Sequence, residues 1–297
     1  MKQNINAMKF LKIGVYGLLV IILVVAICLG TFIYKAKYGI NIYETTPHEL
    51  SEKYRDRSIL VLSKTIAFRH GEAIEASKAV FEDIALRNNW NIYMTEDAGI
   101  INVEQLNLFD VVVCNNCTGK VMNPDQRAIF KSYILAGGGF MGIHGAGDDS
   151  HQWEWYTDTL IGARFSHHPI EFQIQSAELN KEMNVDSSHF FNSTLPSNFT
   201  ASDEWYVFYE SPRGGDGVNV LYTLAEANLS WDGSLGPFLK YKNYGMGEDH
   251  PIVWYRDVGE GRSIYTAMGH NKVAWENPNH RLILETGMRW AGGNGLK

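Results

Sequence analysis

Cysteine is scarce in this 297-residue chain, which has only three. Cys28 lies in an apolar N-terminal run, and no second Cys-x-x-Cys motif accompanies the one formed by Cys114 and Cys117. The sequence therefore does not support a zinc site built on cysteines. A redox-active pair usually opens a helix, where its thiol pKa is lowered. This pair instead ends the apolar run Val111–Cys114, so we expect it to serve ordinary packing.

Acidic side chains are absent from the first 38 residues, where the only charged side chains are five lysines. Removing these from the 26 lysines and arginines leaves 21 basic residues against 33 acidic ones, a net charge of −12. A domain this acidic repels phosphate backbones. The sequence therefore predicts that nucleic acid is not a partner.

Charge is also missing from the 22 residues Ile13–Tyr34. At about 1.5 Å per residue, a helix of this length spans the hydrocarbon layer of a bilayer. A cleaved signal peptide would have a shorter apolar region and a small-residue cleavage site, so we expect an uncleaved signal anchor over 13–34. Three lysines precede the run and two follow it, which favours a cytoplasmic tail over 1–12 and an extracytoplasmic domain.

The rest of the chain has no internal repeat and no low-complexity tract. Residues 35–57 are polar and predict a tether, and residues 58–293 predict one domain. Apolar runs alternate with helical spacing from Ser58 to His144, which predicts a doubly wound, mostly parallel sheet. The expected strands here are Ser58–Lys64, Asn91–Met94, Val111–Cys114 and Phe140–Ile143, and the expected helices are Gly71–Asn89, Val103–Leu108 and 123–136. Further strands are expected at Ile170–Ile174, Val218–Tyr222, Ile252–Tyr255 and Ser263–Ala267, with a terminal helix at Pro278–Ala291.

Polar motifs follow several of the expected strands. In such sheets ligands bind beyond the carboxyl ends of the strands, so we expect His70, His144 and His270 to meet at one rim. A single histidine is usually structural, whereas three on one rim indicate a functional pocket. The accompanying candidates are Phe68, Arg69, Asn115 and Asn116, of which Arg69 and the two amides are expected to hold substrate oxygens.

The turn Gly142-Ile143-His144-Gly145-Ala146 has the pattern of a nucleophile elbow, in which a sharp turn after a strand exposes one side chain. A serine or cysteine is lacking at the exposed position, which His144 occupies. Imidazole serves as a base, an acid or a metal ligand near neutral pH. Hydrolysis through a serine or cysteine nucleophile is therefore disfavoured. The alternative is that the glycines simply allow close packing.

Two further clusters supply candidate site residues. Asp203-Glu204-Trp205-Tyr206 carries adjacent carboxylates, which point opposite ways in an extended chain, so one of them is expected to face the pocket. It could orient a histidine or act as a base, and a solvated turn is the alternative. His250 opens an expected strand and could reach the rim. His167 and His168 are adjacent, an arrangement that seldom places both side chains on one metal ion.

These motifs together resemble the ThuA-like (trehalose utilisation) family. The matching pieces, in chain order, are Phe68-Arg69-His70, Asn115-Asn116, Gly142 to Gly145, Phe165 to Pro169, Asp203 to Tyr206, His250-Pro251 with Trp254, and Gly261-Arg262-Ser263 through Gly269-His270. These motifs are spread over nearly the whole domain. The resemblance rests on their number and on their order along the chain. The membrane anchor is not a general feature of the family.

The resemblance implies a flavodoxin-like fold of the kind found in class I glutamine amidotransferases. In that larger group the elbow holds a catalytic cysteine, assisted by a later histidine. Here His144 occupies the elbow and His270 resembles the later position, so glutaminase activity is not expected. The resemblance also implies a small-molecule partner, a sugar or a keto-sugar derivative.

The leading hypothesis is a carbohydrate-processing enzyme, a lyase, isomerase or hydrolase. His144 and His270 would exchange protons with the substrate, assisted by His70, with Glu204 or Asp203 orienting one of them. Gly145 and Trp205 would line the site, and Tyr206 and Trp254 would stack on a sugar face. No cofactor is assigned, although a divalent metal held by histidine and carboxylate is an open variant. The alternatives are a non-catalytic sugar-binding module and a structural membrane protein with scattered, non-converging histidines.

Overall fold

A nine-stranded mixed sheet forms the centre of the computed structural model, which describes residues 2–182, 190–237 and 239–296. The strand order is β2-β1-β3-β4-β11-β10-β9-β6-β7, and the first five strands run parallel. These five strands are β1 Ser58–Leu62, β2 Asn91–Thr95, β3 Val111–Asn115, β4 Gly139–Ile143 and β11 Gly261–Thr266. Their order is that of a flavodoxin-like doubly wound sheet, so the predicted fold class is confirmed.

The other four strands extend the sheet in antiparallel fashion. They are β6 Gln175–Lys181, β7 Asn198–Asp203, β9 Asn219–Leu224 and β10 Pro251–Val258. Two short strands, β5 Phe165–His167 and β8 Val207–Phe208, form a separate antiparallel pair. The expected strand at Ile170–Ile174 is wrong, because those residues form a turn and the strand begins at Gln175.

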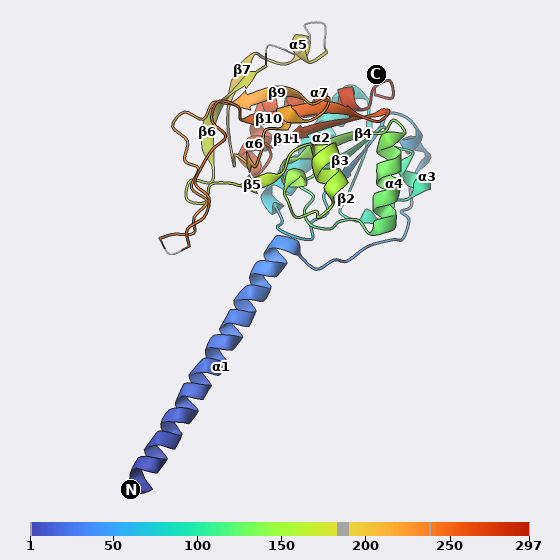
Figure 1. Ribbon diagram of the computed structural model, residues 1–297. Coiled ribbons are helices and arrows are strands. Elements are labelled where there is room, and N and C mark those ends of the chain that lie inside the picture. Colours follow the sequence, from blue (N-terminus) through green and yellow to red (C-terminus); the bar gives the residue numbers. More distant parts are fainter. Residues whose placement is uncertain (1, 183–189, 238, 297) are drawn as a thin grey trace.

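Helices cover both faces of the parallel half of the sheet (Figure 1). On one face α2 contacts α6, and α7 contacts both α6 and the strands β4 and β11, whereas α3 and α4 lie together on the other face. The helices are α2 Gly71–Asn88, α3 Val103–Leu106, α4 Pro124–Leu135, α5 Phe190–Thr194, α6 Lys272–Glu276 and α7 Pro278–Ala291. Asn123 and Gln126 form a reciprocal capping box at α4, with Pro124 in its first turn. This is the start that the sequence predicts.

The N-terminal helix α1, Lys2–Tyr38, projects away from the domain (Figure 1). Its segment Lys12–Lys35 is long and apolar enough to cross a membrane, and none of it is buried against the domain. An apolar helix whose membrane-length stretch is not buried by the protein is suited to a lipid environment.

The segment predicted as a tether lies along the domain. Tyr54 is buried and its ring packs against Tyr93 and Phe109, with ring centroids 5.4 and 5.9 Å away. The backbone N–H of His48 donates to Gln105, and its ring contacts the Tyr93 hydroxyl. Residues 39–57 are therefore integrated with the domain rather than extended between it and the helix.

Substituting Tyr54→Ala tests this integration. Removing a buried aromatic ring leaves a cavity, so we expect a loss on the order of 3 kcal/mol in the free energy of unfolding, measured by urea denaturation. Glu49→Ala, an exposed neighbour in the same segment, should stay within about 0.5 kcal/mol of the parent. Equal, small changes in both variants would show that the segment is a loose tether.

Candidate active site

Three histidines from three loops converge at the carboxyl ends of the parallel strands. His70 follows β1 and precedes α2, His144 follows β4, and His270 follows β11. Their ring centroids are 4.8 to 5.1 Å apart. The structure thus brings together the three rim histidines, which is the arrangement expected of a pocket and not of scattered, degenerate positions.

His144 sits in a strained turn. Its φ is +45°, a left-handed conformation that is uncommon for a residue with a side chain. Its carbonyl accepts a hydrogen bond from the Tyr265 hydroxyl at 2.8 Å. A Cβ at Gly145 would lie only 3.1 Å from the His70 ring. The turn therefore has the elbow geometry predicted for it, and the glycine beside His144 leaves room for His70.

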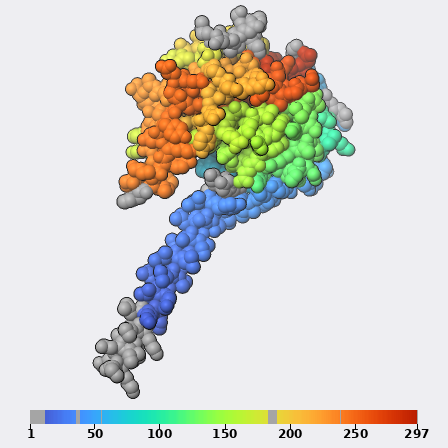
Figure 2. All heavy atoms as spheres, in the orientation of Figure 1, coloured from blue at the N-terminus to red at the C-terminus, as the bar shows by residue number. Residues whose placement is uncertain are grey.

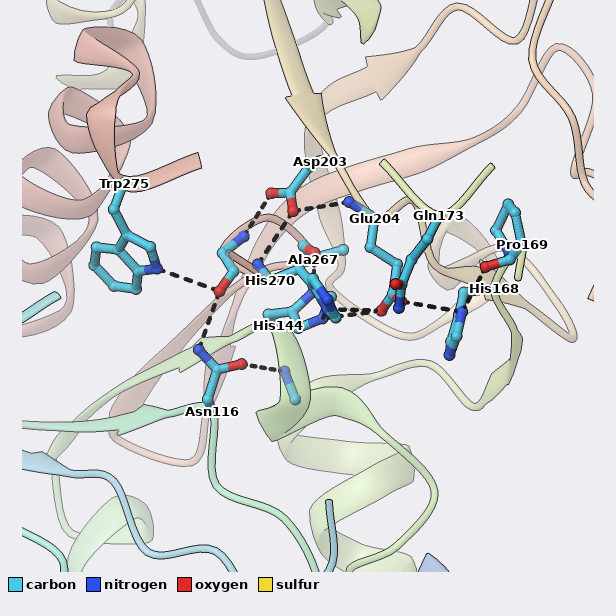
Figure 3. Close-up of polar contacts among 12 residues, drawn as sticks. Asn116, His144, His168, Pro169, Gln173, Asp203, Glu204, Ala267, His270 and Trp275 are labelled. Carbon is cyan, nitrogen blue, oxygen red and sulfur yellow. Dashed lines mark hydrogen bonds and ion pairs between the residues drawn. The ribbon is translucent and has the colours of Figure 1, made fainter. Parts of the chain in front are cut away.

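Glu204 is the centre of the cluster, buried to 1% exposure of its side chain. Its Oε2 lies 3.2 Å from His144 Nε2 and 3.1 Å from His270 Nδ1. Its Oε1 lies 3.0 Å from His168 Nδ1 and accepts from Gln173 Nε2 at 2.5 Å (Figure 3). Three imidazoles therefore surround one buried carboxylate.

The hydrogen-bond partners define the tautomer of His144. Its Nδ1 lies 2.7 Å from the carbonyl oxygen of Ala267, which can only accept, so Nδ1 must carry the hydrogen. The neutral ring then has its lone pair at Nε2, 3.2 Å from His270 Nδ1 and facing Glu204. Two acceptors thus face each other, and a proton or another cation is required between them.

The electrostatics of the cluster place that positive charge on His270. Burial alone would raise the pKa of Glu204. The contacts of Glu204 with His144 and His270 outweigh burial and hold this pKa well below the usual range for a glutamate. Burial likewise lowers the pKa of His270, but the Glu204 carboxylate outweighs this effect and raises it. Burial, together with repulsion from His144 and His270, lowers the pKa of His70 to about 2, so His70 is neutral.

Asp203 faces the same loop, and its hydrogen bonds within the described residues come from backbone N–H groups. Its carboxylate accepts from the N–H groups of Gly269 at 2.6 Å, Glu204 at 2.8 Å and His270 at 3.1 Å (Figure 3). Burial raises its pKa, and the nearby histidines and these hydrogen bonds oppose that rise. Glu204 is therefore the carboxylate that orients the imidazoles, and Asp203 holds the backbone that carries His270.

The two asparagines cross-link the rim. Asn116 donates to the carbonyl of Gly269 at 3.1 Å and accepts from the N–H of Gly145 at 3.3 Å (Figure 3). Asn115 donates to the hydroxyls of Ser63 and Ser77. Both amides are fully buried, so neither reaches substrate oxygens. Asn116 positions the loops of His144 and His270, and Asn115 ties β3 to Ser63 after β1 and to Ser77 in α2.

Several other predicted binding residues also have protein partners. Arg69 is exposed and forms a two-pronged ion pair with Glu96. Trp254 is 1% exposed and packs in the core against Phe208 and Tyr265, so it does not offer a face for a sugar. Trp205 is fully buried and donates to the Gln175 carbonyl.

Aromatic residues flank the histidines on two sides. Tyr206 lies against the His144 ring, with centroids 4.1 Å apart, and is itself buried. The ring of His250 contacts the backbone carbonyl of Tyr206 through Nε2 at 2.8 Å and Glu226 through Nδ1 at 2.6 Å. His250 therefore positions Tyr206. Phe68 is 55% exposed and lies edge-on to His70, which makes it the predicted aromatic that solvent and ligands can reach.

Sequence reasoning missed two residues that contact Glu204. The segment Phe165 to Pro169 could supply a polar contact, but its sequence does not show which histidine does so. In the structure His167 contacts Trp231 and Tyr244, and His168 reaches Glu204. Gln173 lay inside the wrongly expected strand Ile170–Ile174, and no sequence signal distinguished it.

The donor set also fits a divalent cation. One ligand atom each from His70, His144, Glu204 and His270 lies within 4.8 Å of the others. Within the described part of the chain, His70 Nδ1 is buried without a hydrogen-bond partner. Ligands about 2 Å from a tetrahedral zinc ion lie about 3.4 Å apart, so a small contraction of the cluster would enclose an ion.

Together the sheet order and the histidine-lined elbow define a flavodoxin-like α/β protein whose elbow carries histidine in place of serine or cysteine. Residues 58–291 match the ThuA family, described as trehalose utilisation. The chain therefore belongs to the ThuA family. No curated protein matches it.

The solved structures that are similar to this chain include two ThuA-like proteins. A ThuA-like protein from Bacteroides uniformis is 24% identical, with a TM-score of 0.64 over 82% of this chain and 94% of its own. A ThuA-like protein from Parabacteroides merdae is 17% identical, with a TM-score of 0.57 over 80% of this chain and 90% of its own. At these identities the likeness establishes the fold.

Substituting Asp203→Asn tests how the His270 loop is held. In the parent, backbone N–H groups donate to both carboxylate oxygens of Asp203. In the variant the amide nitrogen replaces one of these oxygens, so at least one buried N–H group loses its acceptor. We expect a loss on the order of 2 kcal/mol in the free energy of unfolding, measured by urea denaturation. Asp257→Asn, on an exposed side chain, should have almost no effect. A similarly small effect at Asp203 would contradict this role.

Proposed function

We propose that this protein is an enzyme that acts on carbohydrate or keto-sugar derivatives by histidine-mediated proton transfer. The single observation that carries the proposal is the convergence of His144 and His270 on the buried Glu204 carboxylate. The family description, trehalose utilisation, supports a carbohydrate substrate. The elbow has histidine where an acyl-transfer enzyme needs a nucleophile, which favours lyase or isomerase chemistry over an acyl-enzyme route.

The two histidines have different positions in this mechanism. His270 keeps 14% of its side chain exposed, whereas His144 is fully buried. His270 is thus the end that meets the substrate, and His144 is the inner end, 3.2 Å away. In its imidazolium form His270 carries a hydrogen on both nitrogens, so it first donates the Nε2 proton to a substrate oxygen. The neutral ring that remains can then take a proton at Nε2 from a carbon beside a sugar carbonyl, while its Nδ1 proton passes to His144 Nε2. The Glu204 carboxylate stabilises the imidazolium in either position.

The apolar stretch of α1 supports a second part of the proposal, a membrane anchor. We propose that Lys12–Lys35 spans the bilayer, with the N-terminus inside and the domain outside. Three observations support this part of the proposal. The stretch is long and apolar, the domain does not bury it, and more lysines lie on its N-terminal side.

Substituting His144→Gln and His270→Gln tests the proton relay. Each change removes one titratable ring, so we expect turnover on a panel of sugars and their keto derivatives to fall at least about 100-fold. His48→Gln, a matched change away from the rim, should retain parental turnover. Unchanged rates in both site variants would overturn the mechanism. A sugar that binds to the parent and is recovered unaltered would instead identify a non-catalytic binding module.

A metal-dependent form of the same function is favoured by the unpartnered Nδ1 of His70. The residues that would hold the ion are His70, His144, Glu204 and His270. A divalent cation there would supply Lewis-acid polarisation of a sugar carbonyl.

Elemental analysis of the purified full-length chain tests whether the site binds a metal ion, and it does so independently of activity. After expression with added zinc or manganese, we expect about one ion per chain, reduced at least tenfold in His70→Ala. His168→Ala is the control, because His168 contacts Glu204 but is outside the four-residue set, and it should keep the ion. Absence of metal from the parent, or equal content in the parent and His70→Ala, would rule this form out.

A further inference from the structure

The link between α1 and the domain is fixed at the rim that carries the histidines. Gly39 packs so closely on Ile66 that a Cβ there would overlap the Ile66 carbonyl. The Lys64 ammonium donates to the Ile42 carbonyl and pairs with Glu44. Ile66 belongs to the loop after β1 that leads to His70, so the helix leaves the domain from the rim and not from the opposite edge.

A bilayer around α1 must therefore lie close to the site. Lys35 ends the apolar stretch, and the chain is held against the rim by Ile42. Seven residues span at most about 25 Å even when fully extended. The distance between Lys35 and Ile42 cannot exceed this value for any tilt of the helix. It is limited by the length of the chain between them, and the contact of Ile42 with Lys64 fixes one end.

A hairpin over residues 232–243 projects on the same side of the domain as α1. Its bridges join Asp232 to Asn243 and Leu235 to Leu239. Figure 1 shows the orange hairpin and the blue helix below the sheet, and Figure 2 shows the same protrusion beside the helix. The base of the hairpin packs on the segment of His167 and His168, where Ile170 donates to the Asp232 carbonyl.

The described tip of this hairpin has the composition of a membrane-interface element. Leu235 and Leu239 are 60% and 59% exposed, and Tyr241 is 55% exposed. Lys240 follows Leu239 directly in the sequence, whereas the ammonium of Lys242 is held against Ser166 and Tyr209. Apolar side chains beside tyrosine and lysine suit the boundary between headgroups and acyl chains. Two exposed leucines at a projecting tip are costly in water and are stabilised by contact with lipid.

A groove extends from this tip to His168, at the edge of the histidine cluster. Its volume is about 340 Å³, and Phe165, Ile170, Leu235 and Leu239 contribute much of its apolar wall. His168 lines the same groove and contacts Glu204. The groove therefore offers an apolar group a place between the hairpin and the histidine cluster.

We propose that the hairpin tip lies in the bilayer interface beside α1, so that the rim faces the membrane and the carbohydrate that enters the site is carried on a lipid. The proposal rests on the membrane anchor and the carbohydrate activity proposed above. The groove would hold the apolar portion of the lipid nearest the sugar, and the sugar itself would reach His270 past His168.

Fluorescence quenching of the full-length protein in phosphatidylcholine vesicles tests the orientation. A bimane label at Leu235→Cys, in a Cys28→Ser background whose other cysteines are buried, reports on the hairpin. The control is Leu86→Cys, which is 83% exposed near the end of α2 that points away from the rim. With a nitroxide high on the acyl chain, we expect quenching at least threefold stronger at 235 than at 86. Equal quenching at the two positions would overturn the proposal.

Paired substrates test the lipid-carried sugar. The probes are a keto-glucosyl diacylglycerol in vesicles and the matching methyl keto-glucoside in solution. We expect the ratio of the lipid rate to the soluble rate to fall about tenfold in the double variant Leu235→Ser, Leu239→Ser. An unchanged ratio would overturn the lipid-carried substrate. Failure of the parent to turn over either probe would contradict the proposed function itself, while the quenching experiment would still decide the orientation.

Discussion

The buried carboxylate of Glu204 is the constraint on which the site depends. A charged carboxylate without solvent is costly unless positive charge and hydrogen bonds compensate it. The compensation comes from His168, His270 and the Gln173 amide, and at His144 from the proton or other cation that its Nε2 shares with the cluster. The cluster is preorganised for this reason, and its net charge is set by how many protons or other cations the imidazoles share.

The surrounding structure supports this arrangement through backbone contacts. Asp203 holds the loop of His270, and Asn116 ties that loop to the turn of His144. The left-handed backbone of His144 is tolerated because Tyr265 binds its carbonyl and Ala267 binds its ring. The strain at the elbow is thus offset by tertiary contacts, as is usual where a side chain must be held at a site.

The parallel half of the domain could be predicted from the sequence because its signals are local. Buried strands such as Val111–Asn115 are continuous apolar runs, and α4 begins with an Asn-Pro cap. In the antiparallel half the sequence predicted β9 and β10, which are apolar, but it did not predict β6, which is largely polar and exposed on alternate residues. The alternating apolar residues of Ile170–Ile174 instead lie in an exposed turn.

The site was predictable only in its location. The ends of parallel strands identified His70, His144 and His270, since those ends must share a rim. The connection between β7 and β8 determines that Glu204, and not Asp203, contacts the imidazole rings. The short β5–β8 pair determines that His168 contacts Glu204. Trp254 has the composition of a sugar platform, but its strand places it in the core. These contacts and this burial depend on tertiary packing, so no local sequence pattern predicts them.

The most direct test of the central claim is a ¹⁵N NMR measurement of the histidine tautomers in the full-length protein. The claim is that His144 directs a lone pair at Nε2 toward Glu204 and His270. The account predicts a hydrogen on Nδ1 of His144, bonded to the Ala267 carbonyl, and an acceptor-type or cation-bound shift at Nε2. A neutral His144 with its hydrogen on Nε2 would contradict the account, because the acceptor on which both the proton relay and the cation site depend would be absent.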